Sequence, residues 1–219
     1  MTQRILVADT ETSGLGPDAE IVELAYLEID EDMNILDSFD VMVCPKGLIT
    51  PEASAASGIT NLMVEKCLPI EAYIGGNLSE TYLCAHNCKF DYRMLKPYWN
   101  ITGTLCTYRA AMKYFPDAPK HQLQVLRHYL GIEVDAEAHR ALGDVLTTYE
   151  LIKKLLEVSG LDLIGLTEEM DKPIDFESMP WGKHRGVRME DLSWSYCKWL
   201  LGLEDLDPDL RESITRRRR

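Results

Sequence analysis

The sequence predicts an α/β fold, in which a mixed five-stranded sheet is flanked by helices and followed by a small C-terminal appendage. Short β-like runs come first, clear amphipathic helices come later, and further short β-like runs lie among the helices. A chain of 219 residues is long enough for one domain of about 150 residues and a small addition. We therefore expect a main domain at residues 1–160, a linker at 161–176 and the appendage at 177–219.

Five apolar runs are expected to form the strands. An acidic turn at residues 30–34 joins the second run to the third, and this short connection predicts an antiparallel meander. The first run is bounded by the breaker at residues 14–17. The five expected strands are residues 4–8, 21–29, 36–44, 82–85 and 104–107.

Helical spacing of apolar residues predicts the helices. Residues 88–99 form one, and residues 123–130 form a second that stops at Gly131. Residues 142–156 form a long amphipathic helix that ends before Gly160. The acidic stretch that follows marks the expected domain boundary. In the appendage, the simplest interpretation is a small packed unit whose core is Trp194, Trp199 and Leu200.

The charge of the chain is strongly acidic. Thirty-six acidic and 23 basic residues leave a net charge of −13, which argues against a basic-groove nucleic-acid binder. Residues 1–100 alone carry 16 acidic and 6 basic side chains. These carboxylates form either a solvated acidic surface or, in part, ligands for hard cations, which prefer oxygen. The composition does not choose between the two.

Cysteine usage and hydropathy bound the compartment. No apolar run approaches the roughly 18 residues of a membrane span, and the apolar stretch at residues 5–8 is too short for a signal-peptide core. The six cysteines are irregularly spaced, and Cys84 and Cys88 lack the second close pair of a zinc site. We expect reduced thiols in a cytoplasmic protein without membrane contact.

Asp9 and Glu11 are the first candidates for chemistry. If the first strand extends to them, its period of two places both carboxylates on one face, where they suit a divalent metal. The alternative is a solvated surface pair. Asp91 follows a strand end at a helix start, where α/β sites usually lie. Its alternative role is an acid that interacts with the helix dipole.

His139 and Asp144 form the third candidate element. The histidine lies at the start of the long helix and the aspartate one turn inside it, so one polar side of the helix can present both to a shared pocket. A histidine titrates near neutrality and is a natural general base beside a metal-bound water. The alternative is a surface or capping histidine.

Three strings together resemble the motifs of the DnaQ-like (DEDDh) 3′–5′ exonuclease family. They are VADTETSGL at residues 7–15, HNCKFD at 86–91 and HRALGD at 139–144. Their order and separations also match, and the resemblance covers residues 3–158. The strings at 179–186 and 194–201 resemble the C-terminal segment of one member. The resemblance implies a ribonuclease H-like fold.

The resemblance also implies a mechanism. Asp9, Glu11, Asp91 and Asp144 would hold two Mg²⁺ ions, with Mn²⁺ as a substitute, and His139 would deprotonate the attacking water. The reaction would be metal-dependent hydrolysis of phosphodiester bonds from a free 3′ end of DNA, with release of nucleoside 5′-monophosphates.

A further set of residues would contact the terminal nucleotide by the same resemblance. Glycine permits close backbone approach, and Leu15 can wedge against a base. The alternative roles of Asn87 and Phe90 are turn formation and core packing. One departure is Ser57 before Gly58, where the family often has histidine. The implied substrate-binding residues are Thr10, Thr12, Gly14, Leu15, Asn87 and Phe90.

The appendage offers basic groups beside an aromatic residue. Such a combination suits backbone contact and base stacking, and the arginines at 216–219 can touch phosphate without specificity. The alternative is again a packed unit. The candidate residues are Lys183, His184, Arg185 and Arg188, beside Trp181.

Other functions compatible with the sequence are kept as alternatives. An exoribonuclease would use the same five catalytic residues, and so would a proofreading subunit docked on a polymerase. A noncatalytic nucleic-acid-binding protein on a nuclease fold has no need for all five. The expected partner is DNA with a free 3′ end, with RNA and an oligomer left open. The acidic charge predicts weak retention on DNA and distributive action.

Overall fold

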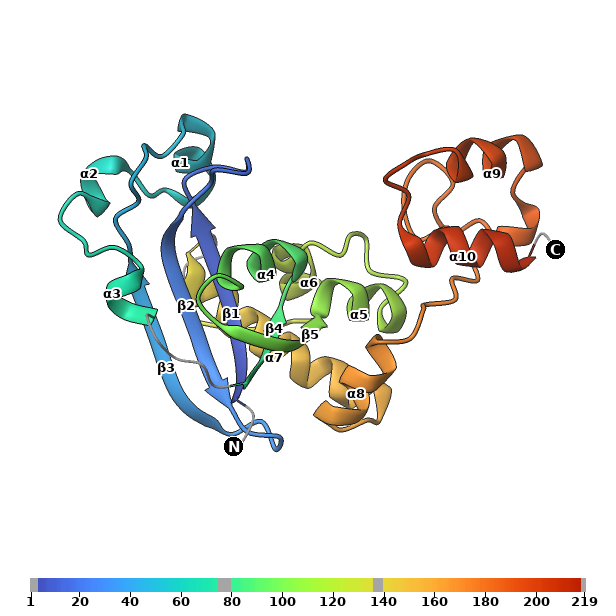
Figure 1. The fold of residues 1–219 in the computed structure, drawn as a ribbon. Coiled ribbons are helices and arrows are strands. Elements are labelled where there is room, and N and C mark those ends of the chain that lie inside the picture. Colours follow the sequence, from blue (N-terminus) through green and yellow to red (C-terminus); the bar gives the residue numbers. More distant parts are fainter. Residues whose placement is uncertain (1–3, 75–79, 136–139, 218–219) are drawn as a thin grey trace.

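A mixed five-stranded sheet forms the centre of the main domain in the computed structural model, which describes residues 4–74, 80–135 and 140–217 (Figure 1). The strand order is β3-β2-β1-β4-β5. The first three strands are antiparallel, whereas β4 and β5 run parallel to β1, which confirms the predicted mixed sheet. The strands are β1 (Arg4–Thr12), β2 (Ile21–Ile29), β3 (Ile35–Met42), β4 (Glu80–Ala85) and β5 (Asn100–Cys106).

Helices follow the strands in the order that the sequence predicts. Three short ones precede β4, one connects β4 to β5, and the rest come after the sheet is complete. The described helices of the main domain are α1 (Pro51–Ser57), α2 (Asn61–Val64), α3 (Glu71–Ile74), α4 (Lys89–Leu95), α5 (Thr107–Tyr114), α6 (Leu123–Tyr129), α7 (Ala141–Ser159) and α8 (Leu163–Met170). The appendage holds the 3-10 turn η1 (Met189–Asp191), α9 (Trp194–Leu201) and α10 (Pro208–Arg217).

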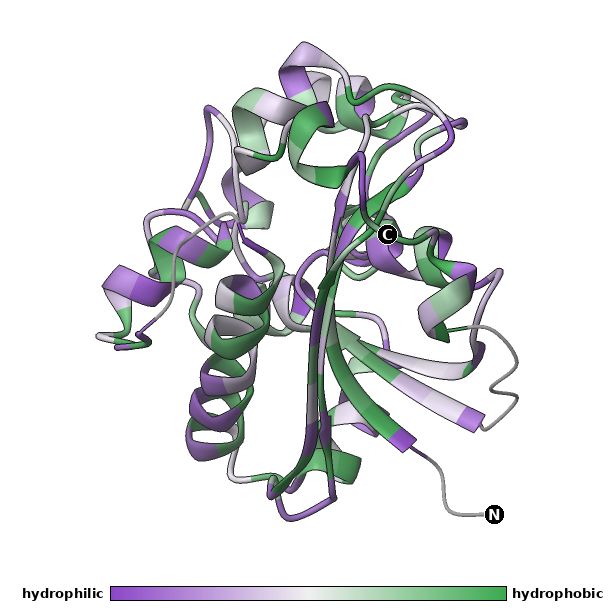
Figure 2. Cartoon of the chain, turned by 90° about the vertical axis from the view of Figure 1, so that its left-hand side faces the viewer, coloured by the Kyte–Doolittle hydropathy of each residue, from purple (hydrophilic) through white to green (hydrophobic). Residues whose placement is uncertain are grey.

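Strand alternation gives the sheet two different apolar faces. Val7 packs with Leu126 of α6 and Val145 of α7 in a core that also includes α5 and α8. Its neighbour Leu6 packs on the opposite face with Leu95 of α4. Figure 2 shows hydrophobic stretches along the strands and mixed colouring on the helices that cover them. Residues next to each other in β1 therefore meet different helices, which matters at its carboxyl end.

The segment expected to be a linker is largely part of the main domain. Residues 163–170 of this segment form α8, whose Leu163, Leu166 and Met170 are buried in the core that includes α7. The side chain of Asp162 accepts a hydrogen bond from the Gly165 N–H at 2.7 Å and caps the helix. The sequence analysis assigned this helix to a linker because the acidic residues at its end are typical of a solvent-exposed loop.

The appendage has a small core of its own. Ile174, Met189, Leu200 and Leu210 are buried there, and Met112 of α5 joins them from the main domain. Leu200 is thus a core residue, as expected. The two tryptophans that were expected beside it are exposed, so that part of the prediction was wrong. A helix as short as α9 buries only one stripe, and bulky apolar side chains outside that stripe remain in solvent.

Two arginines join the appendage to the main domain. Arg109 of α5 forms a two-pronged ion pair with Asp209 of α10, with Nε–Oδ2 and Nη2–Oδ1 distances of 2.7 and 3.0 Å. Arg185 donates to the backbone carbonyls of Pro116, Ala118 and Pro119. Arg185 was a candidate for nucleic-acid contact, but its guanidinium instead satisfies backbone carbonyls of the main domain.

All six cysteines are free thiols, as expected. Among the described residues, no helix has both the length and the apolar character that a membrane span needs.

Candidate active site

The carboxyl end of β1 lies beside an opening in the sheet. β1 pairs with β4 only as far as Val7, whereas its pairing with β2 continues to Thr12. Open α/β sheets place their sites at such carboxyl ends, where neighbouring strands diverge. Because side chains alternate, Asp9 and Glu11 lie on the α7 side of the sheet and Thr10 lies on the α4 side.

Asp9, Glu11 and Asp144 bring three carboxylates together. One oxygen from each lies within 4.8 Å of the other two. Asp144 comes from the first turn of α7, the helix that packs along β1 and β2. The donor set consists of carboxylate oxygens alone, which is what hard divalent cations prefer. The residues present therefore fit a divalent metal ion.

Asp91 approaches β1 from the opposite face. Its Oδ1 accepts hydrogen bonds from the Thr10 N–H at 3.0 Å and from the Thr10 hydroxyl at 2.8 Å. The side chain is buried, so Asp91 is not a surface acid that merely interacts with the dipole of α4. It neighbours the cluster of three without belonging to it. Thr10, expected against a nucleotide, uses its hydroxyl to hold Asp91.

Burial and mutual repulsion raise the pKa values of these carboxyl groups. The pKa of Asp9 lies well above its usual range, first because of burial and then because of the charges of Asp91 and Asp144. Burial, Asp144 and Glu23 raise the pKa of Glu11 to about 7. Burial also raises the pKa of Asp91 to about 7. Such a concentration of negative charge favours a bound cation.

A buried ion pair fixes the start of α7, and sequence reasoning missed it. Glu23 of β2 is only 1% exposed and accepts from Arg140 Nε at 3.0 Å and from the Ala141 N–H at 2.9 Å. It thereby satisfies donors at the helix N-terminus. Since Asp144 follows one turn later, this pair sets its position. The available signal was a carboxylate in the most apolar part of β2, between Val22 and Leu24.

Two further sets of hydrogen bonds position parts of the site, and no sequence pattern indicated them. Gln124 of α6 donates from Nε2 to Asp144 Oδ1 at 2.6 Å. His86 is held between the Thr107 hydroxyl, 3.0 Å from Nδ1, and the His121 carbonyl, 2.8 Å from Nε2. Burial lowers the pKa of His86 to about 4, so the ring is neutral and donates from Nε2 to the carbonyl. It anchors the turn that leads into α4.

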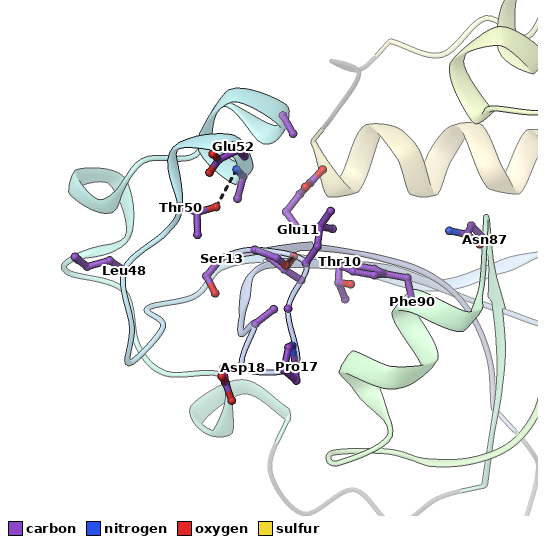
Figure 3. A pocket seen from close by; sticks show the side chains of 17 residues that line it. Thr10, Glu11, Ser13, Pro17, Asp18, Leu48, Thr50, Glu52, Asn87 and Phe90 are labelled. Carbon is purple, nitrogen blue, oxygen red and sulfur yellow. Dashed lines mark hydrogen bonds between the residues drawn. The ribbon is translucent and has the colours of Figure 1, made fainter. Parts of the chain in front are cut away.

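A cavity of about 730 Å³ opens beside the carboxylates, and we call it the β1 pocket (Figure 3). Glu11 lines it, so the pocket and the carboxylate cluster share a wall. Its size is typical of small-ligand sites. All the implied substrate-binding residues line it, namely Thr10, Thr12, Gly14, Leu15, Asn87 and Phe90.

Local hydrogen bonds shape the rim of the β1 pocket. The Thr12 hydroxyl donates to the Gly14 carbonyl at 2.7 Å, which tightens the turn after β1. Leu15 follows and is 82% exposed, although it is strongly apolar. Asn87, on the other side, adopts a φ of 63°, a conformation that asparagine tolerates better than most residues. An apolar side chain and an amide are therefore both exposed at the pocket.

Two other sequence predictions meet the structure differently. Ser57, which stands where the family often has histidine, is buried, and its hydroxyl donates to the Ala53 carbonyl at 3.0 Å. It therefore closes α1 and does not face the pocket. His139 lies outside the described residues, so its expected role as a general base stays a prediction.

The amino-acid sequence is similar to those of known DNA exonucleases and polymerase subunits. Exodeoxyribonuclease 10 of Escherichia coli is 28% identical over 216 residues, which cover 95% of this chain and 96% of the relative. DNA polymerase III subunit epsilon of Aquifex aeolicus is 29% identical over 163 residues, covering 69% of this chain and 80% of the relative.

Solved structures show the same fold. Exonuclease X in complex with 5′ overhanging duplex DNA superimposes with a TM-score of 0.64 and 29% identity, covering 77% of this chain and 99% of that one. Escherichia coli exonuclease I bound to a deoxythymidine oligonucleotide gives a TM-score of 0.61 at 20% identity, covering 73% and 42%. The exonuclease family model of the RNase T type matches residues 6–152, which include the whole carboxylate cluster. The chain belongs to this DnaQ-like exonuclease family.

Proposed function

We propose that this protein is a 3′–5′ exodeoxyribonuclease that hydrolyses DNA from a free 3′ end and releases nucleoside 5′-monophosphates. One observation carries the proposal: the cluster of Asp9, Glu11 and Asp144 borders the β1 pocket through Glu11. A scissile phosphate beside the carboxylates and a terminal nucleotide in the pocket would then be neighbours. A noncatalytic binding protein has no use for a cluster of like charges that raises its own pKa values.

Divalent metal ions are the cofactors of this exonuclease family. We infer that the ions here are Mg²⁺, that two bind, and that Mn²⁺ can replace them. Asp9, Glu11, Asp91 and Asp144 would hold them, since these carboxylates surround the end of β1 from both faces. When bound, the ions supply Lewis-acid activation of water and compensate charge on the attacking and leaving oxygens.

The chain's own residues bind the terminal nucleotide, orient a carboxylate and accept a proton. Leu15 packs against the terminal base, because an exposed apolar side chain at the rim gains from covering a nucleobase. Phe90 and Asn87 close the other side. Thr10 holds Asp91 through two hydrogen bonds, so that carboxylate keeps one orientation. His139 accepts the proton of the attacking water, as a group that titrates near neutrality can.

The coverage of the relatives supports DNA as the substrate. Exodeoxyribonuclease 10 matches 95% of this chain, whereas the polymerase subunit matches 69%. The match to an exodeoxyribonuclease thus extends into the appendage. We also place the protein in the cytoplasm, a proposal supported by six free thiols and testable by cell fractionation.

A nuclease assay tests the proposal directly. Single-stranded DNA, duplex DNA and RNA, each with a 5′ label, are incubated with the full chain and Mg²⁺ or a chelator. We expect DNA to shorten stepwise from the 3′ end with Mg²⁺ only. Nucleoside 5′-monophosphates should appear as the product, identified by chromatography.

Active-site variants distinguish hydrolysis by this protein from hydrolysis by a contaminating nuclease. Asp9→Asn and His139→Ala should abolish shortening, whereas Asp37→Asn, which removes the same charge from an exposed position of β3, should not. Activity that survives in both active-site variants would refute the mechanism. Shortening of RNA alone would replace the substrate with RNA.

A further inference from the structure

Helix α9 of the appendage exposes two large aromatic side chains. Trp194 is 47% exposed and Trp199 is 58% exposed, whereas Cys197 and Leu200 of the same helix are buried in the appendage core. Only one side of α9 therefore packs against the appendage core. Exposed tryptophans cost free energy in water unless something covers them.

Trp199 belongs to a stacked group of rings that includes a residue of a neighbouring turn. Trp199 stacks on Tyr196 with ring centroids 5.6 Å apart and an angle of 26°, and the Tyr196 ring lies 4.4 Å from the ring of His184. We call these three rings, together with the exposed Trp194 at the start of the same helix, the α9 aromatic face. Rings held against one another offer flat surfaces that are already ordered, which lowers the entropic cost of stacking a ligand on them.

The segment that carries the α9 aromatic face has more basic than acidic side chains, although the chain as a whole carries −13. Residues 181–199 contain four basic and two acidic side chains. Arg185 is occupied by backbone carbonyls, and Arg188 pairs with Glu190. Lys183 and Lys198 are exposed, and neither forms an ion pair within the described parts of the chain.

Lys198 lies close to one of the tryptophans. Its Nζ is 5.3 Å from the centre of the Trp194 ring. On an α-helix, positions 194 and 198 share one side, and position 199 lies next to them around the axis. The exposed arc of α9 therefore presents two indoles with an ammonium group between them. Flat rings for bases and an ammonium for phosphate are the combination that binds single strands.

The α9 aromatic face is separate from the β1 pocket. The appendage lies beyond the β5 edge of the sheet, on the opposite side of the molecule from α1, which borders the pocket (Figure 1). A mononucleotide in the pocket cannot reach α9. A ligand that occupies both must be a chain with repeated bases and phosphates.

We propose that the α9 aromatic face binds single-stranded DNA upstream of the 3′ end held in the β1 pocket. Bases stack on Trp194 and Trp199, and Lys183 and Lys198 contact phosphates. The proposal rests on the proposed exonuclease function. It gives an acidic enzyme a local way to retain a strand between hydrolytic steps.

Binding of labelled oligo(dT) to the full chain in chelator tests this surface, because no hydrolysis then occurs. A long strand of about 20 nucleotides can span both sites, and a short one of about 4 nucleotides fills the pocket alone. We expect Trp199→Ala and Trp194→Ala each to weaken binding of the long strand about five-fold or more in fluorescence anisotropy. Binding of the short strand should not change.

Matched variants exclude general effects. Tyr129→Ala removes an aromatic ring of 47% exposure from α6 and should leave both affinities unchanged. Trp199→Phe keeps a stacking surface and should restore most of the lost affinity. Lys198→Gln should reduce the salt dependence of long-strand binding, since one phosphate contact disappears.

Two results would overturn the proposal. One is unchanged long-strand affinity in the variant that lacks both tryptophans. The other is a dimer in sedimentation that this double variant dissociates, which would assign the face to a second copy of the chain. Hydrolysis of the short strand with Mg²⁺ reports on the proposed function alone, so a failure of either proposal is recognised separately.

Discussion

Buried charge is arranged in opposite ways at the carboxyl end of β1 and at the joint between the main domain and the appendage. At β1, Asp9, Glu11 and Asp144 gather charges of one sign, and burial raises the pKa of Glu11 to about 7. At the joint, the carboxylate of Asp209 is 7% exposed and meets the guanidinium of Arg109 at 2.7 Å. The carboxylates at β1 repel one another, whereas the carboxylate at the joint is neutralised by an arginine.

The difference separates a functional site from a structural contact. A cluster of like charges lowers the stability of the metal-free fold and becomes favourable only when a cation binds. A hydrogen-bonded ion pair needs no ligand, but breaking it leaves one charge buried alone. Substitutions in the two regions should therefore act oppositely on stability and on activity.

The largest expected effect is that of Asp9→Asn on activity. Loss of a metal-binding carboxylate should lower kcat at least about a hundred-fold, because metal ions contribute several kcal/mol to such reactions. The metal-free variant should nevertheless melt at a higher temperature than the wild type, since one buried repulsive charge is gone. Steady-state kinetics and calorimetry in chelator measure the two. A lower melting temperature would contradict the view that the carboxylate cluster destabilises the metal-free fold.

The next effect is that of Asp209→Ala on stability. We expect a loss of about 3 kcal/mol in urea unfolding, because Arg109 is left partly buried without its partner. Hydrolysis of a short strand by the folded variant should stay near wild type. For comparison, Asp207→Ala removes a cap whose Oδ1 accepts from the Asp209 N–H at 3.0 Å and from the Leu210 N–H at 3.1 Å, together with a weaker interaction with Arg109, and should cost about 1 kcal/mol. Equal losses in the two variants would contradict this prediction.

A pH series of the metal-free protein tests the carboxylate cluster as a whole. The folded-state pKa values of Glu11 and Asp91 are raised to about 7, so the folded state binds more protons than the unfolded state between pH 4 and 7. The stability that these two groups contribute is therefore fully present below their unfolded pKa values and is lost, on the order of several kcal/mol, as the pH rises from about 4 through 7. Mn²⁺ should remove most of this fall. A curve that is flat without metal would argue against the buried cluster.

The smallest expected effect concerns the support of Asp144. Gln124→Leu removes the donor 2.6 Å from Asp144 Oδ1 and should lower kcat about ten-fold, with a raised Mg²⁺ requirement and little change in KM. Gln122→Leu makes the same change at an exposed position two residues earlier and should have no effect. If the metal requirement did not change, Gln124 would not be a positioning residue.

The carboxylates of the site could be predicted from local patterns once the three motifs were taken together as a family resemblance. Asp9 and Glu11 share a face because strands alternate with a period of two, and Asp144 follows one turn into a clear amphipathic helix. The nucleotide contacts came from the family resemblance alone, and they also line one pocket: Thr10, Thr12, Gly14, Leu15, Asn87 and Phe90. Period and spacing are properties of neighbouring residues, so the sequence contains them directly.

The contacts that support these residues could not be predicted in this way. Glu23 and Arg140 are 117 positions apart, and nothing in either neighbourhood points to the other. Asp91 reaches the end of β1 from the α4 side, where Thr10 holds it, and no local pattern in the sequence indicated this partner. Which polar groups become partners depends on how α4 and α7 cross the sheet, and this is settled by packing of their apolar faces.

The appendage shows the same division. Its composition indicated a small packed unit with basic and aromatic residues, and that much the sequence determined by itself. Only the tertiary structure decided that Arg185 binds main-chain carbonyls, whereas Trp199 remains 58% exposed. The reason is geometric: a helix buries one stripe, and which side chains lie outside it depends on where the neighbouring elements pack.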